Sequence, residues 1–186
     1  MIQNRQQALE FLHLNVKNEK MIAHSLASEA VMRNLAEYLN RDSDAWALAG
    51  LLHDVDVEAT NADPFTHGIV GAQWLLNEGL DPEIADAVTM HNEVSSGKDR
   101  YTEFQHALAA GETITGLIMA TALVYPDRKI ASVKTKSVVK RMKEKAFAAS
   151  VKRENILECE KIGIPLDQFA EMAIKAMTAI ADEIGL

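Results

Sequence analysis

Apolar residues recur along this chain at helical spacing, three or four positions apart. Residues 5–16 and 19–39 show the pattern first, with Ile22, Leu26 and Ala30 on one face of the second segment. Such spacing is typical of amphipathic helices. No stretch alternates apolar and polar residues with the period of two that indicates a strand. The pattern therefore predicts an all-α protein, a single-domain bundle of about eight or nine helices.

Capping residues divide the pattern into segments. Asn18, Asp42 (or its neighbour Ser43) and Asp81 are typical N-caps, because their side chains accept hydrogen bonds from the first free amides of a helix. Gly79 and Pro126 are typical helix ends. Besides the two segments above, helices are expected at 43–53, 65–77, 82–91, 101–124, 132–149, 153–161 and 165–184, with polar loops at 55–64 and 93–100.

The chain shows no internal repeat, no low-complexity segment and no flexible Gly/Ser linker. We therefore expect residues 1–186 to form a single domain. Residues from about 19 to 125 would form the core around the candidate site described below. The more charged helices from about 130 to 186 would pack on that core.

Composition narrows the class of protein. Hydrophobic residues make up 48% of the chain and charged residues 25%, as in ordinary soluble domains. The net charge of -8 argues against a nucleic-acid or membrane partner. One cysteine, Cys159, suits a reducing compartment. Residues 3–7 are all polar, so no secretory signal is visible near Met1, and no run approaches the ~18 apolar residues of a membrane span. We expect a cytoplasmic protein.

The chemistry centres on the adjacent pair His53-Asp54, which ends the apolar helix 43–53. Imidazole and carboxylate are good ligands for divalent transition metals. His13 and His106 lie within helices without such a setting and are not candidates. Separate helices can direct ligands to one point from their ends. The other candidates lie near expected helix starts or ends, or on the long helix 101–124: His24, His67, His91 and Glu112.

This set, in this order, resembles the HD-domain superfamily of metal-dependent phosphohydrolases. The segments that carry the resemblance, to a subgroup of small stand-alone hydrolases, are 50–58, 67–72, 109–124, 134–137 and 145–148. The resemblance thus covers nearly the whole chain and implies a helical metal-binding core.

The resemblance also implies roles for individual residues. His24, His53 and Asp54 would hold a first metal, together with a final acid. His67 and His91 would hold a second metal, with Asp54 bridging the two. The family has Asp as its final acid, whereas this chain has Glu112, whose side chain is one methylene longer. We expect one or two divalent ions of manganese, iron, cobalt, nickel or zinc.

Two further acids follow the pair. Asp56 and Glu58 could orient a water, protonate a leaving oxygen or hold a ligand histidine. The alternative is that both belong to a solvated loop. Together with Asp54, they are the candidate catalytic residues.

A basic segment is the second feature, because residues 128–145 hold eight of the 19 Lys and Arg residues. It is either a solvated outer face or a clamp for substrate phosphate. Lys134 and Lys136 are the candidate substrate ligands, since they are the closest to the long preceding helix.

The leading hypothesis is a metal-dependent phosphohydrolase that hydrolyses a small phosphate ester or nucleotide with a metal-activated water. One alternative is a di-iron oxygenase of the HD type, because four histidines permit two irons. Another is a binding module that has lost catalysis, because Glu112 replaces Asp. The sequence leaves substrate and oligomeric state open.

Overall fold

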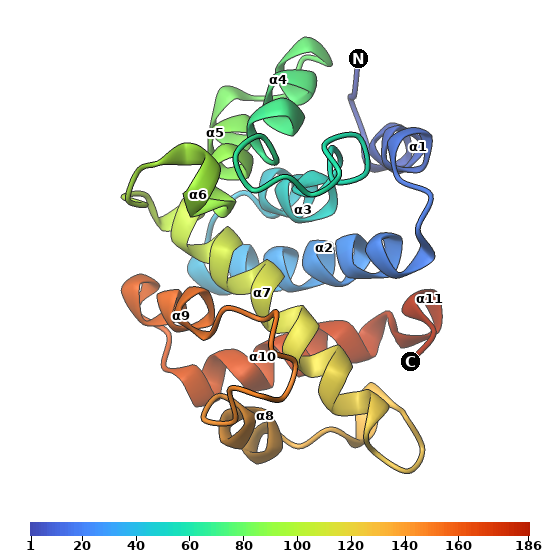
Figure 1. Ribbon diagram of the computed structural model, residues 1–186, viewed down its shortest axis with the longest axis vertical. Coiled ribbons are helices and arrows are strands. Elements are labelled where there is room, and N and C mark those ends of the chain that lie inside the picture. Colours follow the sequence, from blue (N-terminus) through green and yellow to red (C-terminus); the bar gives the residue numbers. More distant parts are fainter.

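Two helices of 21 residues, α2 (Glu19–Leu39) and α7 (Glu103–Leu123), pack across each other at the centre of the computed structural model, which describes residues 1–186 (Figure 1). On one side of α2 lie α1 (Arg5–Asn15), α3 (Ser43–Leu52), α4 (Ile69–Asn77), α5 (Pro82–His91) and α6 (Glu93–Ser96). On the other lie the 3₁₀ helices η1 (Ile130–Ser132) and η2 (Leu157–Ile162), with α8 (Thr135–Arg141), α9 (Arg153–Ile156), α10 (Leu166–Ala179) and α11 (Ala181–Ile184).

The prediction of an all-α bundle is confirmed, since the chain contains helices and turns and no strand. Three of the eleven α-helices (α6, α9 and α11) are single turns of four residues. The remaining, longer helices agree with the expected number.

One apolar core serves the whole chain. Its side chains form one continuous cluster in space, to which residues from Ile2 to Ile184 contribute. The cluster includes large, fully buried side chains from both halves of the chain, such as Leu12, Leu117 and Phe169. The C-terminal helix α10 packs against both α2 and α7. The C-terminal helices are therefore part of the same body as the helices that carry the histidines.

The expected N-caps lie at helix starts. The Asn18 side chain accepts a hydrogen bond from the Lys20 amide, and the Asp42 side chain accepts from two amides of α3. Asp81 caps α5, with Pro82 in the first turn. Thr102 and Gln105 form a complete capping box at the start of α7. Local side-chain chemistry therefore fixed these starts.

The prediction of a helix from residue 65 is wrong, because α4 begins at Ile69. The Asp63 side chain accepts hydrogen bonds from the Phe65 amide and the Thr66 hydroxyl, which holds this stretch in turns. Gly68 then has a φ of 90°, outside the helical region. The delay places His67 in a turn rather than on a helix.

The prediction of a basic helix over 132–149 is also wrong, because α8 ends at Arg141 and turns follow as far as residue 151. The buried guanidinium of Arg153 donates to carbonyls in this stretch, among them those of Glu144, Ala148 and Val151. These carbonyls are thus satisfied without a helix. Smaller differences are the α6 turn within the expected loop 93–100, the 3₁₀ geometry of 157–162, and the break at Ile180 between α10 and α11.

Helix α7 is long and apolar enough to span a membrane by length and composition alone. However, 67% of its most apolar window is buried inside the bundle. Its hydrophobicity is accounted for by its central position in the core.

Gly50 lets α3 approach α2, because a Cβ at Gly50 would lie 2.6 Å from the Ser28 carbonyl oxygen. We predict that Gly50→Ala lowers the free energy of unfolding by about 1–3 kcal/mol through overpacking. Gly116→Ala is the matched control, because a Cβ at Gly116 meets only Val151 at 3.4 Å. It should be neutral, or stabilising by up to about 1 kcal/mol, because alanine is the better helix former. Urea denaturation measures both, and equal effects would contradict the close-packing explanation.

Candidate metal centre

Five segments that are distant in sequence bring six potential ligands together. His24 lies on α2, and His53 and Asp54 directly follow α3. His67 lies in the turn before α4, and His91 is the last residue of α5. The sixth ligand is Glu112, in the middle of α7. All six residues predicted as metal ligands therefore lie in one cluster.

The buried carboxylate of Asp54 is at the centre of the cluster. Its Oδ1 lies 3.0 Å from Nε2 of His67 and 3.5 Å from Nε2 of His91. Its Oδ2 lies 3.4 Å from Nε2 of His53 and 3.6 Å from Nε2 of His24. Each carboxylate oxygen thus faces one pair of histidines, which is the arrangement of a bridging ligand between two positions.

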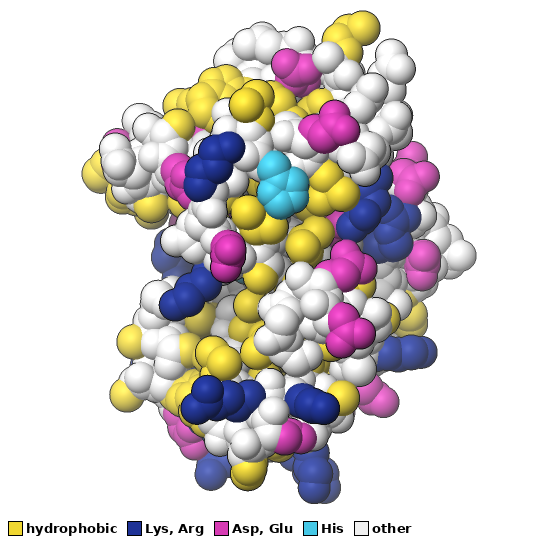
Figure 2. All heavy atoms as spheres, turned by 90° about the vertical axis from the view of Figure 1, so that its right-hand side faces the viewer, with side chains coloured by type: hydrophobic (Ala, Val, Ile, Leu, Met, Phe, Trp, Pro, Cys, Tyr) yellow, Lys and Arg dark blue, Asp and Glu magenta, His cyan; other side chains and the backbone are white.

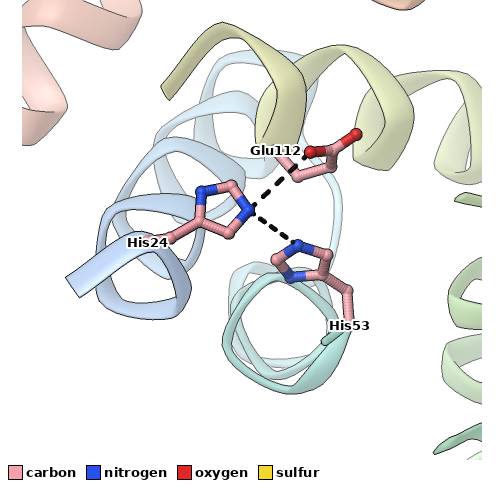
Figure 3. Close-up of side chains that lie close together, drawn as sticks. All are labelled: His24, His53 and Glu112. Carbon is pink, nitrogen blue, oxygen red and sulfur yellow. Dashed lines mark hydrogen bonds and ion pairs between the residues drawn. The ribbon is translucent and has the colours of Figure 1, made fainter. Parts of the chain in front are cut away.

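Figure 3 shows His24, His53 and Glu112 pointing toward one another from three helical segments. Nε2 of His24 lies 3.1 Å from Nε2 of His53 and 3.8 Å from Oε2 of Glu112. The other carboxylate oxygen of Glu112 accepts a hydrogen bond from the Thr113 hydroxyl. The longer acid at position 112 therefore reaches the cluster.

The Nδ1 atoms of the four histidines all have hydrogen-bond partners outside the cluster. Those of His53 and His91 lie 2.8 and 2.5 Å from the carbonyl oxygens of Gly50 and Val88, each three residues earlier in the chain. Nδ1 of His67 lies 2.7 Å from Asp56, and Nδ1 of His24 lies 2.9 Å from the Thr115 hydroxyl. Carbonyls and carboxylates only accept, and the Thr115 hydroxyl itself donates to the Glu112 carbonyl. In every case Nδ1 is therefore the donor.

With Nδ1 as donor, the neutral form of each ring has a lone pair on Nε2, and these lone pairs point into the cluster. Nε2 atoms face each other at 3.1 Å (His24 and His53) and 3.2 Å (His67 and His91). Facing lone pairs repel unless a cation or a proton lies between them. The residues divide into two potential ligand groups, His24, His53 and Glu112 on one side and Asp54, His67 and His91 on the other. The donor set fits divalent transition metals.

The pKa values of the cluster residues also indicate that positive charge is favoured at this place. Burial lowers the pKa of His53 to about 3, so this ring is neutral. Burial opposes the charge of His67 too, but its hydrogen bonds to Asp54 and Asp56 outweigh this and raise the pKa to about 10. Burial disfavours the charge of Asp54, yet the surrounding imidazoles hold the pKa of Asp54 well below its ordinary range. Burial raises the pKa of Glu112.

Asp56 holds His67 from outside the cluster. Its buried carboxylate accepts from His67 Nδ1 and from the amides of Gly68 and Gly71, at 2.7, 2.9 and 2.7 Å. Gly71 permits this approach, because a Cβ there would lie 3.1 Å from the Asp56 carboxylate; a Cβ at Gly68 would instead lie 3.2 Å from the His91 ring. Of the three roles considered for Asp56, the geometry matches the holding of a ligand histidine.

The remaining predicted residues lie away from the cluster. Glu58 accepts hydrogen bonds from the amides of Lys17 and Asn18 and so fastens its loop to the start of α2. Lys136 lines a separate surface hollow on α8, and neither Lys134 nor Lys136 lines the cavity over the histidines. Their roles in catalysis and substrate binding stay predictions.

A cavity of about 360 Å³ opens over the cluster, and only two of its 14 lining residues are hydrophobic. The sequence reasoning missed part of its wall: Thr113, Gly116, Ser150, Val151, Lys152 and Asn155. Gly116 could have been found from its i, i+4 spacing with Glu112, whereas Thr113 is the adjacent residue and has no such spacing. The other four come from the segment 150–155, which no motif connects to the histidines.

A helical bundle that directs histidines from several helix ends onto one Asp is the arrangement of a metal-binding domain. The family model described as "HD domain" matches residues 21–146, more than half of the chain. The chain belongs to the HD-domain family, which confirms the resemblance and implies the superfamily of metal-dependent phosphohydrolases.

A curated relative is similar over a shorter stretch. A ribonuclease Y of Opitutus terrae is 30% identical over 77 residues, which are 41% of this chain and 14% of that protein. The chain thus corresponds to a small part of this relative's length. No solved structure matches.

The hydrogen bond from His67 to Asp56 gives a prediction about metal content. Asp56→Asn removes the charge that orients His67, so affinity at the His67–His91 position should fall about 10–100-fold, the usual effect of an outer-shell partner. Affinity at the His24–His53 position should change less. Metal analysis after graded chelation measures the two classes of site. Asp63→Asn, in the same loop but with a side chain that bonds only to Phe65 and Thr66, is the control and should keep the parent's metal content.

Proposed function

We propose that this protein is a metal-dependent phosphohydrolase that acts on a small phosphate ester or nucleotide. The observation that carries the proposal is the convergence of four Nε2 atoms on the two oxygens of Asp54, at the base of a polar cavity. Membership of the HD-domain family supports the same reaction class.

Bound divalent metals would supply a water of lowered pKa and would neutralise charge on a phosphoryl oxygen. The chain's own residues would hold these metals and orient the ligands. His24, His53, Asp54 and Glu112 would form one ligand set, and His67, His91 and Asp54 the other. Asp56 keeps the proton of His67 on Nδ1, so that Nε2 faces the cluster. Asp54 remains ionised and contributes negative charge to both positions.

The cavity favours a polar substrate of modest size. Its volume of about 360 Å³ lies at the small end of the usual range for ligand sites. Thr113, Ser150 and Asn155 provide hydrogen-bonding side chains in its wall. The proposed partner is therefore a small phosphorylated molecule, and a cytoplasmic location belongs to the same proposal.

The relative's name, ribonuclease Y, raises RNA as a substrate. Two observations favour a small ester instead. The net charge is -8, which opposes binding of a polyanion. In addition, acidic and basic side chains are interspersed on the face in Figure 2, without a continuous basic surface there. We propose that neither nucleic acid nor a membrane is a partner.

A di-iron oxygenase is the second candidate, because the same four histidines, with Asp54 between two ligand groups, also suit two irons. Iron content with oxygen uptake would favour it over hydrolysis. A non-catalytic binding module is the third. A chain that stays metal-free when purified without chelator would favour it.

The test begins with metal analysis of the native protein. A screen of phosphomonoesters, phosphodiesters and nucleotides with several divalent ions follows. Asp54→Asn should lower hydrolysis more than about 100-fold, beyond the effect of an outer-shell partner, because it removes the shared charge. His13→Ala should keep full activity, because His13 is exposed on α1. Unchanged activity of Asp54→Asn would place the reaction elsewhere.

Glu112 gives a separate prediction about the first metal position. Glu112→Gln keeps the side-chain length but removes the negative charge that balances the metal. It should therefore weaken metal binding more than Glu112→Asp, which keeps the charge and shortens the reach. Calorimetric titration with the native metal measures the order. Equal binding by both variants and the parent would put Glu112 outside the ligand set.

A further inference from the structure

Lys152 is the only Lys or Arg among the residues that line the cavity. It directly precedes α9, on the segment that closes one side of the cavity together with Ser150 and Val151. Its side chain is 51% exposed. A flexible cation thus stands at the wall of a cavity whose base carries the histidine cluster.

The backbone around Lys152 is fixed, although its side chain is not. The next residue, Arg153, is buried and donates to the carbonyls of Ala148 and Val151 at 2.8 and 2.7 Å, and also to that of Phe147. These bonds tie the turns before Lys152 to the start of α9. The ammonium group can therefore change partners by side-chain rotation alone.

The present partner of Lys152 is Glu93 of α6, which also lines the cavity. Nζ of Lys152 lies 2.5 Å from Oε1 of Glu93. The other oxygen of Glu93, Oε2, lies 3.0 Å from the Arg100 guanidinium. Glu93 thus has two cationic partners, one on each oxygen.

Arg100 cannot leave this position easily. Only 5% of its side chain is exposed, and it also donates to the carbonyls of Met90 and His91 and to Glu158. If Lys152 moves away, Glu93 still has a fixed cation beside it. The pair that would break is partly exposed, and exposed ion pairs contribute little stability.

We propose that Lys152 binds the phosphate group of the substrate and exchanges Glu93 for it. A phosphate offers more negative charge and more acceptor oxygens than a carboxylate, so the exchange favours the substrate. This inference rests on the proposed phosphohydrolase function and replaces Lys134 and Lys136 as the substrate ligands.

The same cavity wall narrows the substrate class. With a single Lys, the wall can pair with one phosphate group rather than with each phosphate of a polyphosphate chain. It contains no Phe, Tyr or Trp on which a nucleobase could stack. The preferred substrate is therefore a phosphomonoester with a small, polar, non-aromatic remainder.

The experiment uses the metal-loaded full chain. Calorimetry measures the Kd for inorganic phosphate, and steady-state kinetics measure the KM for the best phosphomonoester of the screen. Lys152→Ala should raise both the Kd for phosphate and the KM about 10- to 100-fold, the loss of one charged hydrogen bond. Lys152→Arg should recover most of this loss. Glu93→Gln should tighten phosphate binding, because the competing charge is gone.

Lys161→Ala is the matched control, since Lys161 is exposed, pairs with Glu158 at 3.8 Å and does not line the cavity. It removes the same charge and should leave both constants unchanged. Metal content should be equal in all variants, which separates phosphate binding from assembly of the metal centre.

The outcomes distinguish this inference from the proposed function. If the parent hydrolyses phosphomonoesters but Lys152→Ala keeps its KM and its Kd for phosphate, the inference is overturned and the function stands. If the parent hydrolyses nothing but Lys152→Ala weakens phosphate binding, the phosphate site stands and the function falls. If the metal-loaded parent neither binds phosphate nor hydrolyses any substrate of the screen, both are overturned.

Discussion

The buried charge of Asp54 is the constraint on which the rest of the structure depends. A carboxylate removed from water costs several kcal/mol unless donors or cations surround it. Here the two oxygens face four imidazoles, from α2, the end of α3, the turn before α4 and the end of α5. A shift of any of these segments would move an imidazole Nε2 away from the carboxylate oxygen that it faces. The positions of the segments are therefore coupled through one side chain.

The rings need orientation as well as proximity. The last carbonyls of a helix lack some of their intrahelical partners. His53 and His91 stand at the ends of α3 and α5 and donate Nδ1–H to carbonyls of Gly50 and Val88 in those last turns. Their helix ends thus fix the rings and point Nε2 into the cluster. Asp56 and Thr115 do the same for His67 and His24.

One buried arginine connects the metal core to the C-terminal part of the chain, and a second orders the turns within that part. Arg100 joins the end of α5, where His91 lies, to Glu158 on η2. Arg153 fixes the turns that lead to Lys152. The wall of the cavity is therefore built by residues from both halves of the chain, which the shared core already holds together. Residues from the segment 150–155 thus line the same cavity as the histidines.

Much of this was decided by the sequence alone. Helical periodicity determined the fold class, and local capping at Asn18, Asp42 and Asp81 determined three helix starts, because these interactions involve neighbours in sequence. The six candidate ligands followed from their residue types and order. Tertiary structure decided what depends on distant partners: the late start of α4, the turns after α8 that bond to Arg153, the link between Asp56 and His67, and the place of Lys152 beside Glu93. Lys134, Lys136 and Lys152 carry the same charge in the sequence. Only the packing of the segment 150–155 against α6 and α7 decided which of them lines the cavity, because no local pattern encodes a contact made across 59 residues.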